Sequence, residues 1–556
     1  MSHKDVLAPQ SSEERRRRAR RIREKALEIS QDHSQEEHRP NGEESDYRKR
    51  LGTPVANYSK GLPHNERGEV RKEAYDQLQQ ALRSGDEDDF ERIPLGVPNG
   101  RKQTNPQSGL SFDLEGPDAQ AITLQPVPRL DSRQNTAEMI ELYWMSLLRD
   151  VPFIQFGTDA GVAAAAAELD TFRDVLRVPA GGRITPGTVF RGSTVGSVQG
   201  PLISQYLLRD IPYGSLTISQ RQQTVPVGLA GTTPRGQDYL TDFSSWLAVQ
   251  NGVNVPGPML DPMPRYIRSM RDIARYVQVD ALYEAYLNAA LILLGDVERG
   301  VLVDPGNHYR RSRNQQGFVT FGGPHILSLL TEVATRALKA MWFQKWYVHR
   351  RLRPEEFGGR VDIHRRGVRT DYPIRAALLS SQAHQRVLAR FNTSLLPQAF
   401  PEGSPTHPSY GSGHATVAGA CVTILKAWFD GQQTYVGPAE GARVQQANAD
   451  GTELVPYTGG DAGALTIGGE LDKLAANISG ARNMAGVHWR SDYSESIRLG
   501  QKVALRLLQE QSITYNEPNS FDLVDFDGRK VQIEDGRIEV RGPRRAAAHA
   551  DAVPVA

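Results

Sequence analysis

Three stretches of this chain repeat apolar residues with the period of an α-helix, and this repetition limits the fold more than any other feature. The stretches are residues 137–148, 270–294 and 326–352. Asn135 precedes the first stretch and is a possible N-terminal cap, because its side chain can accept a hydrogen bond from a free helical N–H. Long helices with one apolar stripe bury it most readily against one another. We therefore predict a mainly α-helical fold in which long helices form bundles.

The two ends of the chain differ in composition from this helical body. Residues 1–50 are rich in Glu, Arg, Gln and Ser, so we expect an arm that is disordered by itself or wraps a neighbouring subunit. Its arginine-rich part, residues 15–23, has an alternative interpretation as a nucleic-acid-binding patch. Residues 516–542 contain short alternating segments separated by Asp-Gly pairs, which predict a β-hairpin. Residues 543–556 are expected to form a loose tail.

Length and charge exclude several classes of protein. A chain of 556 residues can bury a large core. Its 66 basic and 65 acidic residues give a net charge of +1, which argues against nucleic acid or a membrane surface as a partner attracted by overall charge. No apolar run reaches the length of a membrane span. Residues 1–32 show no secretory signal, and the single cysteine, Cys421, excludes an intramolecular disulfide. We therefore expect a cytoplasmic protein.

Three separate segments in the second half of the chain carry groups suited to binding an oxyanion such as phosphate or vanadate. These groups belong to Lys345, Arg353, Ser412, Gly413, His414, Arg482 and His488. Two guanidinium groups and one ammonium group can neutralise an anion whose oxygens point in several directions. Glycine beside serine lets a backbone N–H and a hydroxyl group approach those oxygens. His414 and His488 remain for bond formation and proton transfer.

The second and third segments also predict local structure. If residues 412–414 open the apolar run 415–428, the N–H groups and the dipole of a helix N-terminus favour the anion as well. Asp492 lies four residues after His488, within one helical turn. Its carboxylate can therefore hydrogen-bond to one ring nitrogen of that histidine and fix the tautomer.

The first segment should lie at the end of a helix. The helix that starts near residue 326 is expected to deliver Lys345 and to stop near Arg353, because Pro354 disfavours a helical conformation in the residue before it. Lys345 and Arg353 are eight positions apart and would not be aligned on one α-helix. We expect the helix to unwind before Pro354, which would turn the side chain of Arg353 toward the same site as that of Lys345.

Taken singly, each of these residues has an ordinary structural interpretation. The first segment also contains Arg350, Arg351 and Arg360, and a basic helix end is ordinarily solvated. The Ser-Gly-His triplet is typical of a helix cap, and a histidine beside a tryptophan can be a core residue. The occurrence of all three segments together favours an oxyanion site instead. The glycine-rich run 187–200 lacks the Gly-Lys-Ser/Thr ending of a phosphate-binding loop, so we interpret it as loop or packing.

The three segments resemble the signature shared by vanadium-dependent haloperoxidases and related acid phosphatases, written K-x(6)-R-P, P-S-G-H and S-R-x(5)-H-x(3)-D. This chain has seven residues between Lys345 and Arg353 instead of six. It also has Gly411 in place of the proline and Ala481 in place of the serine. The longer spacing is similar to that of bromoperoxidases from red algae and cyanobacteria.

The resemblance extends beyond the motifs and implies a fold. Residues 57–70 and 317–325 are also similar to the bromoperoxidase group, so the likeness covers the chain from about residue 57 to about residue 511. The family fold is a pair of four-helix bundles with the cofactor at the end of one bundle. We therefore expect residues 51–515 to form the helical domain with the vanadate site, followed by the β-hairpin.

The resemblance also implies a role for each residue of the site. His488 would be the axial ligand of vanadate. The residues expected to hold the other oxygens are Lys345, Arg353, Ser412, Gly413 and Arg482. His414 is expected to act as the acid and base that takes a proton from hydrogen peroxide, while Lys345 polarises the peroxide oxygens. His407, five positions before Ser412, is a histidine in bromoperoxidase relatives. We expect it to hydrogen-bond to His414 or to peroxide and to affect catalysis.

The reaction implied is the oxidation of bromide and iodide by hydrogen peroxide. Vanadium stays oxidised and acts as a Lewis acid, and the hypohalous acid or equivalent that forms halogenates an organic acceptor. Chloride should be oxidised poorly. The resemblance further implies a homo-oligomer, which in relatives is a large assembly of dimers. It also allows a bound calcium ion, whose ligands the sequence does not identify.

Two other functions remain open from the residues. An acid phosphatase could use the same set of oxyanion-binding residues, here called the cage: Lys345, Arg353, Ser412, Gly413, His414, Arg482 and His488. In that enzyme His488 would form a phosphohistidine and His414 would act as general acid to the leaving alcohol. Vanadate and phosphate have the same shape, so the cage alone does not separate the two enzymes. A non-catalytic scaffold is the third possibility, but burying so many cations without an anion would be costly.

Overall fold

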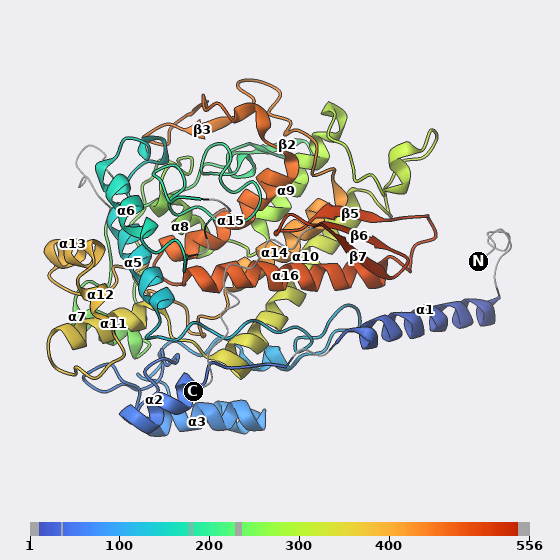
Figure 1. Cartoon of the computed structure of the whole chain (residues 1–556). Helices are drawn as coiled ribbons and strands as arrows, with labels where there is room; N and C mark the ends of the chain where they lie inside the picture. Colours follow the sequence, from blue (N-terminus) through green and yellow to red (C-terminus); the bar gives the residue numbers. More distant parts are fainter. Residues whose placement is uncertain (1–10, 35–36, 177, 179–181, 228–235, 543–556) are drawn as a thin grey trace.

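The computed structural model describes residues 11–34, 37–176, 178, 182–227 and 236–542. Helices dominate this part of the chain, and its strands form small antiparallel sheets (Figure 1). The predicted mainly α-helical fold with a small β element near the C-terminus is confirmed. The predicted tail, residues 543–556, lies outside the described residues, and the domain boundaries stay a prediction.

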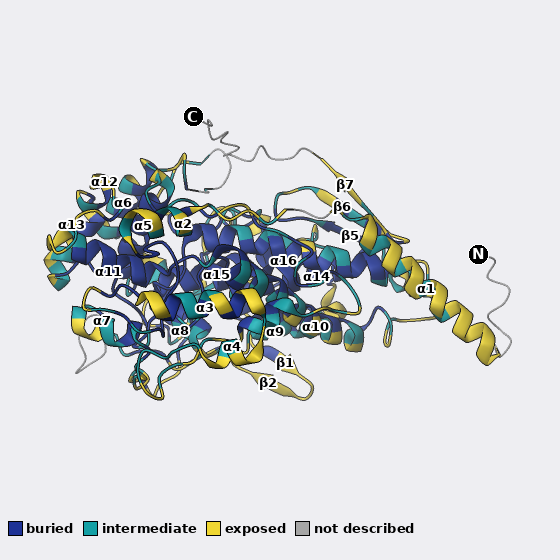
Figure 2. Cartoon of the chain, turned by 90° about the horizontal axis from the view of Figure 1, so that it is seen from below, coloured by how far each residue is buried: buried dark blue, intermediate teal, exposed yellow. Residues whose placement is uncertain are grey.

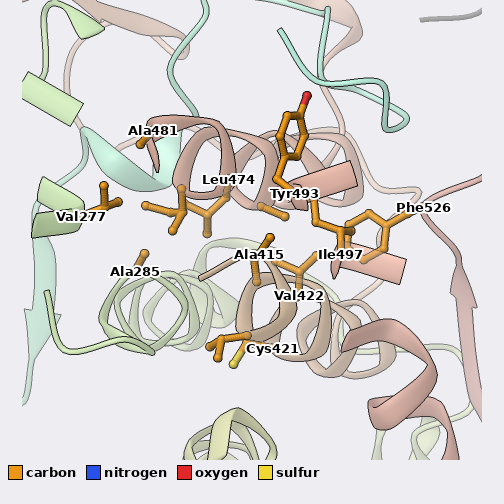
Figure 3. Close-up of a cluster of buried hydrophobic side chains, with 14 of the residues drawn as sticks. Val277, Ala285, Ala415, Cys421, Val422, Leu474, Ala481, Tyr493, Ile497 and Phe526 are labelled. Atoms are coloured by element: carbon orange, nitrogen blue, oxygen red, sulfur yellow. The ribbon is translucent and has the colours of Figure 1, made fainter. Parts of the chain in front are cut away.

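The centre of the molecule is a bundle of long helices. They are α10 (Gly323–Phe343), α14 (Gly413–Trp428), α15 (Ile467–Met484) and α16 (Arg490–Gln511). The helix α14 packs against the other three, and every residue of α14 except His414 is buried. Figure 3 shows Ala415, Leu474 and Ile497, from α14, α15 and α16, in this shared core. His414 is therefore the one side chain of the central helix that reaches toward solvent.

Two glycines let α14 and α16 approach each other closely. A Cβ atom at Gly419 would lie 2.0 Å from the carbonyl oxygen of Ile497. A Cβ atom at Gly500 would lie 1.9 Å from the carbonyl oxygen of Thr416. Both distances are far shorter than van der Waals contact, so a larger residue at either position would force the helices apart. This approach brings the start of α14 next to the start of α16.

A second group of helices packs around α5 (Arg133–Leu148). The helices in contact with α5 include α6 (Ala160–Asp170), α12 (Ala376–Leu379), α13 (Gln382–Phe391) and α15. Separately, α7 (Phe243–Gln250) packs on α11 (Pro354–Arg365). The predicted cap of α5 is wrong. Ser132 caps the helix, and its Oγ accepts a hydrogen bond from the N–H of Asn135 at 3.0 Å. Serine offers the same capping chemistry three residues earlier, so the helix gains nearly one turn.

The apolar stretch 270–294 does not form one long helix, contrary to the prediction. It contains α8 (Met270–Val279) and α9 (Glu284–Gly295), whose axes differ by 99°. Asp280 lies at the break and pairs with His414, so a tertiary contact overrides the helical periodicity. In the described part of the chain, no single helix has the length and apolar character needed to cross a membrane. Only α8 and α9 counted together reach that threshold.

The predicted C-terminal hairpin is part of a three-stranded antiparallel sheet. Its strands in order are β5 (Phe521–Val524), β6 (Lys530–Glu534) and β7 (Arg537–Arg541). The Asp-Gly pair at 527–528 lies between β5 and β6, and the pair at 535–536 lies between β6 and β7. The second turn therefore adds a third strand to the predicted hairpin. The other sheets are hairpins of β1 (Ile211–Tyr213) with β2 (Leu216–Ile218) and of β3 (Gln445–Ala447) with β4 (Leu454–Pro456). The run 187–200 forms neither helix nor strand, and Gly196 packs against Gly469, as predicted.

The N-terminal arm contains regular structure. The helix α1 (Ser12–Asp32) has no buried residue and projects from the body of the molecule (Figures 1 and 2). Ser11 and Glu14 form a capping box, and Arg20 pairs with Glu24 one turn later at 2.6 Å. This part of the arm is therefore helical, whereas the expectation that the arm is disordered by itself or wraps a neighbouring subunit stays a prediction. The helices that follow are α2 (Glu43–Leu51), α3 (Lys72–Ser84) and α4 (Glu87–Glu91).

Candidate active site

The first motif segment leaves its helix through a π-helical turn. The helix α10 continues as the turn Gln344–His349, which holds Lys345. Arg350 then takes a left-handed conformation, with φ of 43°, and the chain runs extended to Arg353. The helix thus ends earlier than predicted, but the predicted unwinding is present. A π-helical turn closes i→i+5 hydrogen bonds and holds one additional residue. It therefore accommodates the additional residue between Lys345 and Arg353.

The N-terminal part of the chain pairs with this extended stretch. The N–H of Tyr58 donates to the carbonyl oxygen of Arg350 at 2.8 Å, and the N–H of Leu352 donates to that of Ala56 at 3.1 Å. Residues 56–58 and 350–352 thus form a short antiparallel pairing. The position of Arg353 depends on backbone contacts with a segment almost 300 residues earlier, as the separation of 293 between Asn57 and Arg350 shows.

The second motif segment opens a helix, as predicted. Ser412 caps α14, and its Oγ accepts a hydrogen bond from the N–H of Ala415 at 3.3 Å. The N–H of Ser412 donates to Oγ of Ser496 in α16 at 2.9 Å. Gly413 is the first residue of the helix. The positive end of the helix dipole and the N–H groups of its first turn therefore lie at the site.

His488 lies between a carboxylate and a guanidinium group. Its Nδ1 is 2.8 Å from Oδ2 of Asp492, and its Nε2 is 2.7 Å from Nη1 of Arg353. The predicted hydrogen bond to Asp492 is confirmed. Because a carboxylate accepts and a guanidinium donates, the ring carries its proton on Nδ1 and presents the lone pair of Nε2 to the site.

Lys345, Arg353 and Arg482 are buried around this histidine. Nζ of Lys345 donates to two main-chain carbonyl oxygens of the second segment, at 2.7 and 3.1 Å. Arg482 donates from Nη1 to a carbonyl oxygen of α8 at 2.7 Å, and its buried Nε has no hydrogen-bond partner among the described residues. The structure therefore brings together the cationic residues that the sequence predicted for one site.

The positive charges of this cluster repel one another. Burial, reinforced by the charge of Arg353, lowers the pKa of Lys345 well below its usual range. Burial lowers the pKa of Arg353 to about 10 and that of Arg482 to about 10. Burial and the nearby cations hold the pKa of His488 far below its usual range. Buried cations are costly unless an anion pairs with them. The charges and the unpartnered Nε of Arg482 fit an oxyanion such as vanadate.

His414 stands at the open side of the site and pairs with a residue that the sequence did not reveal. Its Nε2 is 3.1 Å from Oδ1 of Asp280, in the break between α8 and α9. Burial lowers the pKa of His414, and the carboxylate of Asp280 opposes that shift. The charge of His414 helps to keep the pKa of Asp280 below its usual value although burial acts to raise it. An acidic residue interrupting an apolar run was the only sequence signal for Asp280.

His407 lies in the site but does not make its predicted contact with His414. Its Nδ1 is 2.9 Å from Nη2 of Arg353, and its ring centroid is 4.9 Å from that of Trp342. Burial and the charges of Lys345 and Arg353 hold the pKa of His407 well below its usual range. His407 is therefore a neutral acceptor that orients Arg353. A contact with peroxide stays a prediction.

The other arginines of the first segment are not a solvated basic face. Arg351 is 3% exposed and donates to Oδ1 of Asp492 at 2.9 Å. Arg360 is also 3% exposed and donates to a main-chain carbonyl oxygen at 2.6 Å. Arg350 pairs with Glu44 of α2 at 2.7 Å. Adjacent arginines therefore serve different partners, which their sequence pattern does not distinguish.

Known proteins match both the sequence and the fold. Residues 327–516 match the model of the VCPO second helical-bundle domain. The chain is 38% identical to the vanadium-dependent bromoperoxidase of Corallina pilulifera, over 86% of this chain and 91% of the relative. It is 35% identical to that of Ascophyllum nodosum, over 88% of each. The homohexameric structure of the second vanadate-dependent bromoperoxidase of A. nodosum gives a TM-score of 0.87 at 28% identity, covering 96% of this chain and 93% of that chain.

A helical-bundle fold with a histidine inside a buried cationic cluster defines the vanadium haloperoxidase class, as the motifs predicted. The identity over most of both chains narrows the class further. The chain belongs to the vanadium-dependent bromoperoxidase family, in its algal group. The departures at Gly411 and Ala481 from the signature are therefore variations within that family.

Proposed function

We propose that this protein uses vanadate and hydrogen peroxide to oxidise bromide and iodide to hypohalous acid or an equivalent, which then halogenates an organic acceptor. The observation that carries the proposal is the geometry of His488. Its Nε2 lone pair points into a cluster of three buried cations, while Asp492 holds the proton on the opposite nitrogen. Bound vanadate supplies Lewis-acid chemistry there.

Each residue of the cluster has a part in holding that anion. His488 would be the ligand through Nε2. The residues that would hold the remaining oxygens are Lys345, Arg353, Gly413, Ser412 and Arg482. Arg353 would turn one N–H from His488 toward the anion, and Lys345 would also polarise the oxygens of peroxide. Apart from that turn of Arg353, the fold places these groups before the reaction begins, so the electrostatic stabilisation requires little further reorganisation.

Proton transfer is assigned to His414. Its Nε2 faces Asp280, which leaves Nδ1 to accept a proton from hydrogen peroxide and to return it later. The carboxylate of Asp280 fixes the orientation of the ring and stabilises the positive charge that the ring gains. Asp280 therefore acts through His414.

The test of the proposed function compares two assays of the purified protein. One contains vanadate, hydrogen peroxide and bromide, and the other contains a phosphomonoester without vanadate. Vanadate-dependent bromide oxidation supports the proposal. Hydrolysis of the phosphomonoester without any bromide oxidation would instead establish the acid phosphatase that forms a phosphohistidine on His488.

We expect bromide and iodide to be oxidised readily and chloride poorly. The motif position of His407 supports a bromoperoxidase, and steady-state rates at equal halide concentrations measure the preference. Comparable kcat/KM values for chloride and bromide would contradict it. His407→Ala should change the pH profile of bromide oxidation more than it changes vanadate affinity, because His407 contacts Arg353 beside the reacting groups. His64→Ala is the control, because His64 is another buried histidine, bonded to Ser59. It should not change the pH profile in the same way.

The assembly and the location of the protein are further parts of this proposal. A homo-oligomer is supported by the exposed helix α1, on which Leu27 is 58% exposed, and by the homohexameric relative. Size-exclusion chromatography with light scattering tests it.

Among the described residues, no group of three or more His, Cys, Asp and Glu is arranged to hold a metal ion, so we assign no calcium ligands. A cytoplasmic location is supported by the single free cysteine, Cys421.

A further inference from the structure

Arg351 is a buried cation that the proposed chemistry does not use. Its guanidinium group joins α5 to the start of α16. Nη1 donates to Oδ1 of Asp492 at 2.9 Å and to Oγ of Ser491 at 2.8 Å. Nη2 donates to Oδ1 of Asn135 at 3.0 Å and lies 3.6 Å from a carboxylate oxygen of Glu138. A buried guanidinium group with this many defined partners has one orientation.

The two oxygens of Asp492 have different partners. Oδ1 receives Arg351, whereas Oδ2 receives Nδ1 of His488 at 2.8 Å and the N–H of Trp489 at 3.0 Å. Oδ2 also accepts a hydrogen bond from Oγ of Ser409. Arg351 therefore does two things. It helps to fix the rotation of the Asp492 carboxylate. It also places a positive charge next to Oδ1 of this buried carboxylate.

We propose that Arg351 is a positioning residue for the vanadate ligand: through Asp492 it helps to hold His488 in the Nδ1–H tautomer, with Nε2 unprotonated. The proposal rests on the function proposed above. If Arg351 is lost, Oδ1 of Asp492 loses its bond and the carboxylate is held less firmly, although Oδ2 keeps its other donors. The preference of the imidazole for the Nδ1–H tautomer then weakens, and a ring that carries its proton on Nε2 blocks the ligand position. Partners one step removed from a metal ligand commonly set its orientation and basicity.

The start of α16 offers a matched control. Arg490 is also buried, at 5% exposure, and it also joins α5 to α16 through an ion pair, with Glu141 at 2.5 Å. Its guanidinium group bonds to Glu141 and Tyr493 rather than to Asp492. Arg490→Gln therefore removes a comparable buried ion pair from the same helix interface while leaving the carboxylate behind His488 in place.

The experiment measures vanadate affinity by equilibrium dialysis of the full-length protein and the tautomer of His488 by nitrogen-15 NMR. The signal of His488 is assigned by its absence from His488→Gln. We expect Arg351→Gln to weaken vanadate binding by about tenfold to a hundredfold and to give a mixture of tautomers. Arg351→Lys keeps the charge but cannot reach both Asp492 and Asn135, so it should fall between wild type and Arg351→Gln.

The outcomes separate this proposal from the function on which it rests. A wild-type protein that does not bind vanadate contradicts the proposed function. If the wild type binds vanadate, an Arg351→Gln protein with unchanged affinity and an unchanged tautomer overturns the role of Arg351. Equal losses in Arg490→Gln and Arg351→Gln, with the tautomer unchanged in both, would also overturn it, because they indicate a general effect on packing. Should Arg351→Gln not fold, unchanged affinity in Arg351→Lys overturns the proposal.

Discussion

His488→Ala is expected to lose vanadate binding and halide oxidation together, whereas His414→Ala is expected to retain some vanadate while losing most of its turnover. His488 alone presents an unprotonated Nε2 to the buried cations, with its other nitrogen fixed by Asp492. His414 contributes a proton carrier and a hydrogen bond but no bond to the metal. Equilibrium dialysis and bromide oxidation rates of both variants measure the two effects separately.

The control for this prediction is another buried histidine. His384 is bonded to Oγ of Ser394 at 2.8 Å and to the carbonyl oxygen of Leu379 at 2.9 Å, within the second group of helices. His384→Ala should therefore retain vanadate. Tight binding of vanadate by the His488→Ala protein would show that the ligand has been assigned to the wrong residue.

Arg482→Lys is expected to weaken vanadate binding by about 1.5 to 3 kcal/mol, the range for a hydrogen bond to a charged group. The substitution keeps the charge but loses the planar fork. Nη1 of Arg482 already donates to a carbonyl oxygen of α8, which leaves the unpartnered Nε for the anion. A lysine ammonium cannot serve both positions. Arg353→Lys should weaken binding for the same reason, because Arg353 also bonds to His407 and His488.

The affinity of each variant is measured by vanadate titration of the protein freed of bound anion. Arg360→Lys serves as the control. Arg360 is a buried arginine of the same basic segment, and its Nη1 donates to the carbonyl oxygen of Gly68. Its replacement should lower stability without a comparable loss of affinity. An Arg482→Lys protein with wild-type affinity would mean that the third motif segment does not contact the anion.

The sequence was sufficient to predict which cationic residues and histidines cluster in one site, because three segments with unusual chemistry occurred together. It was not sufficient for residues whose role depends on a distant contact. Asp280 lies in an apolar stretch without Pro or Gly at the break, so nothing local marks the bend between α8 and α9. Arg350 and Arg351 are adjacent and chemically identical. Only the left-handed turn at Arg350 sends one side chain to α2 and the other toward Asp492.

Errors in the predicted elements have similar causes. Ser132 and Asn135 are both good caps. In the structure Ser132 caps α5, while the side chain of Asn135 accepts from Arg351, a contact that the local sequence does not reveal. The helix from residue 326 was expected to reach Arg353, but a π-helical turn gives no clear signal in hydrophobic periodicity. The sequence contains two Asp-Gly turns, but a hairpin needs only one of them. Two successive turns join three strands, so the pattern should have predicted a three-stranded sheet.

The pairing of residues 56–58 with residues 350–352 bears on how this enzyme could be divided into modules. Every residue of the cage lies between positions 345 and 488, inside the family-model match of residues 327–516. A fragment limited to that range would contain these residues but would lack Asp280, which pairs with His414, and the segment that pairs with Leu352. The smallest part of the chain that could be active is therefore larger than the range that contains the site residues. Gene fusions or truncations that preserve the motifs must therefore also preserve the segment around residues 56–58.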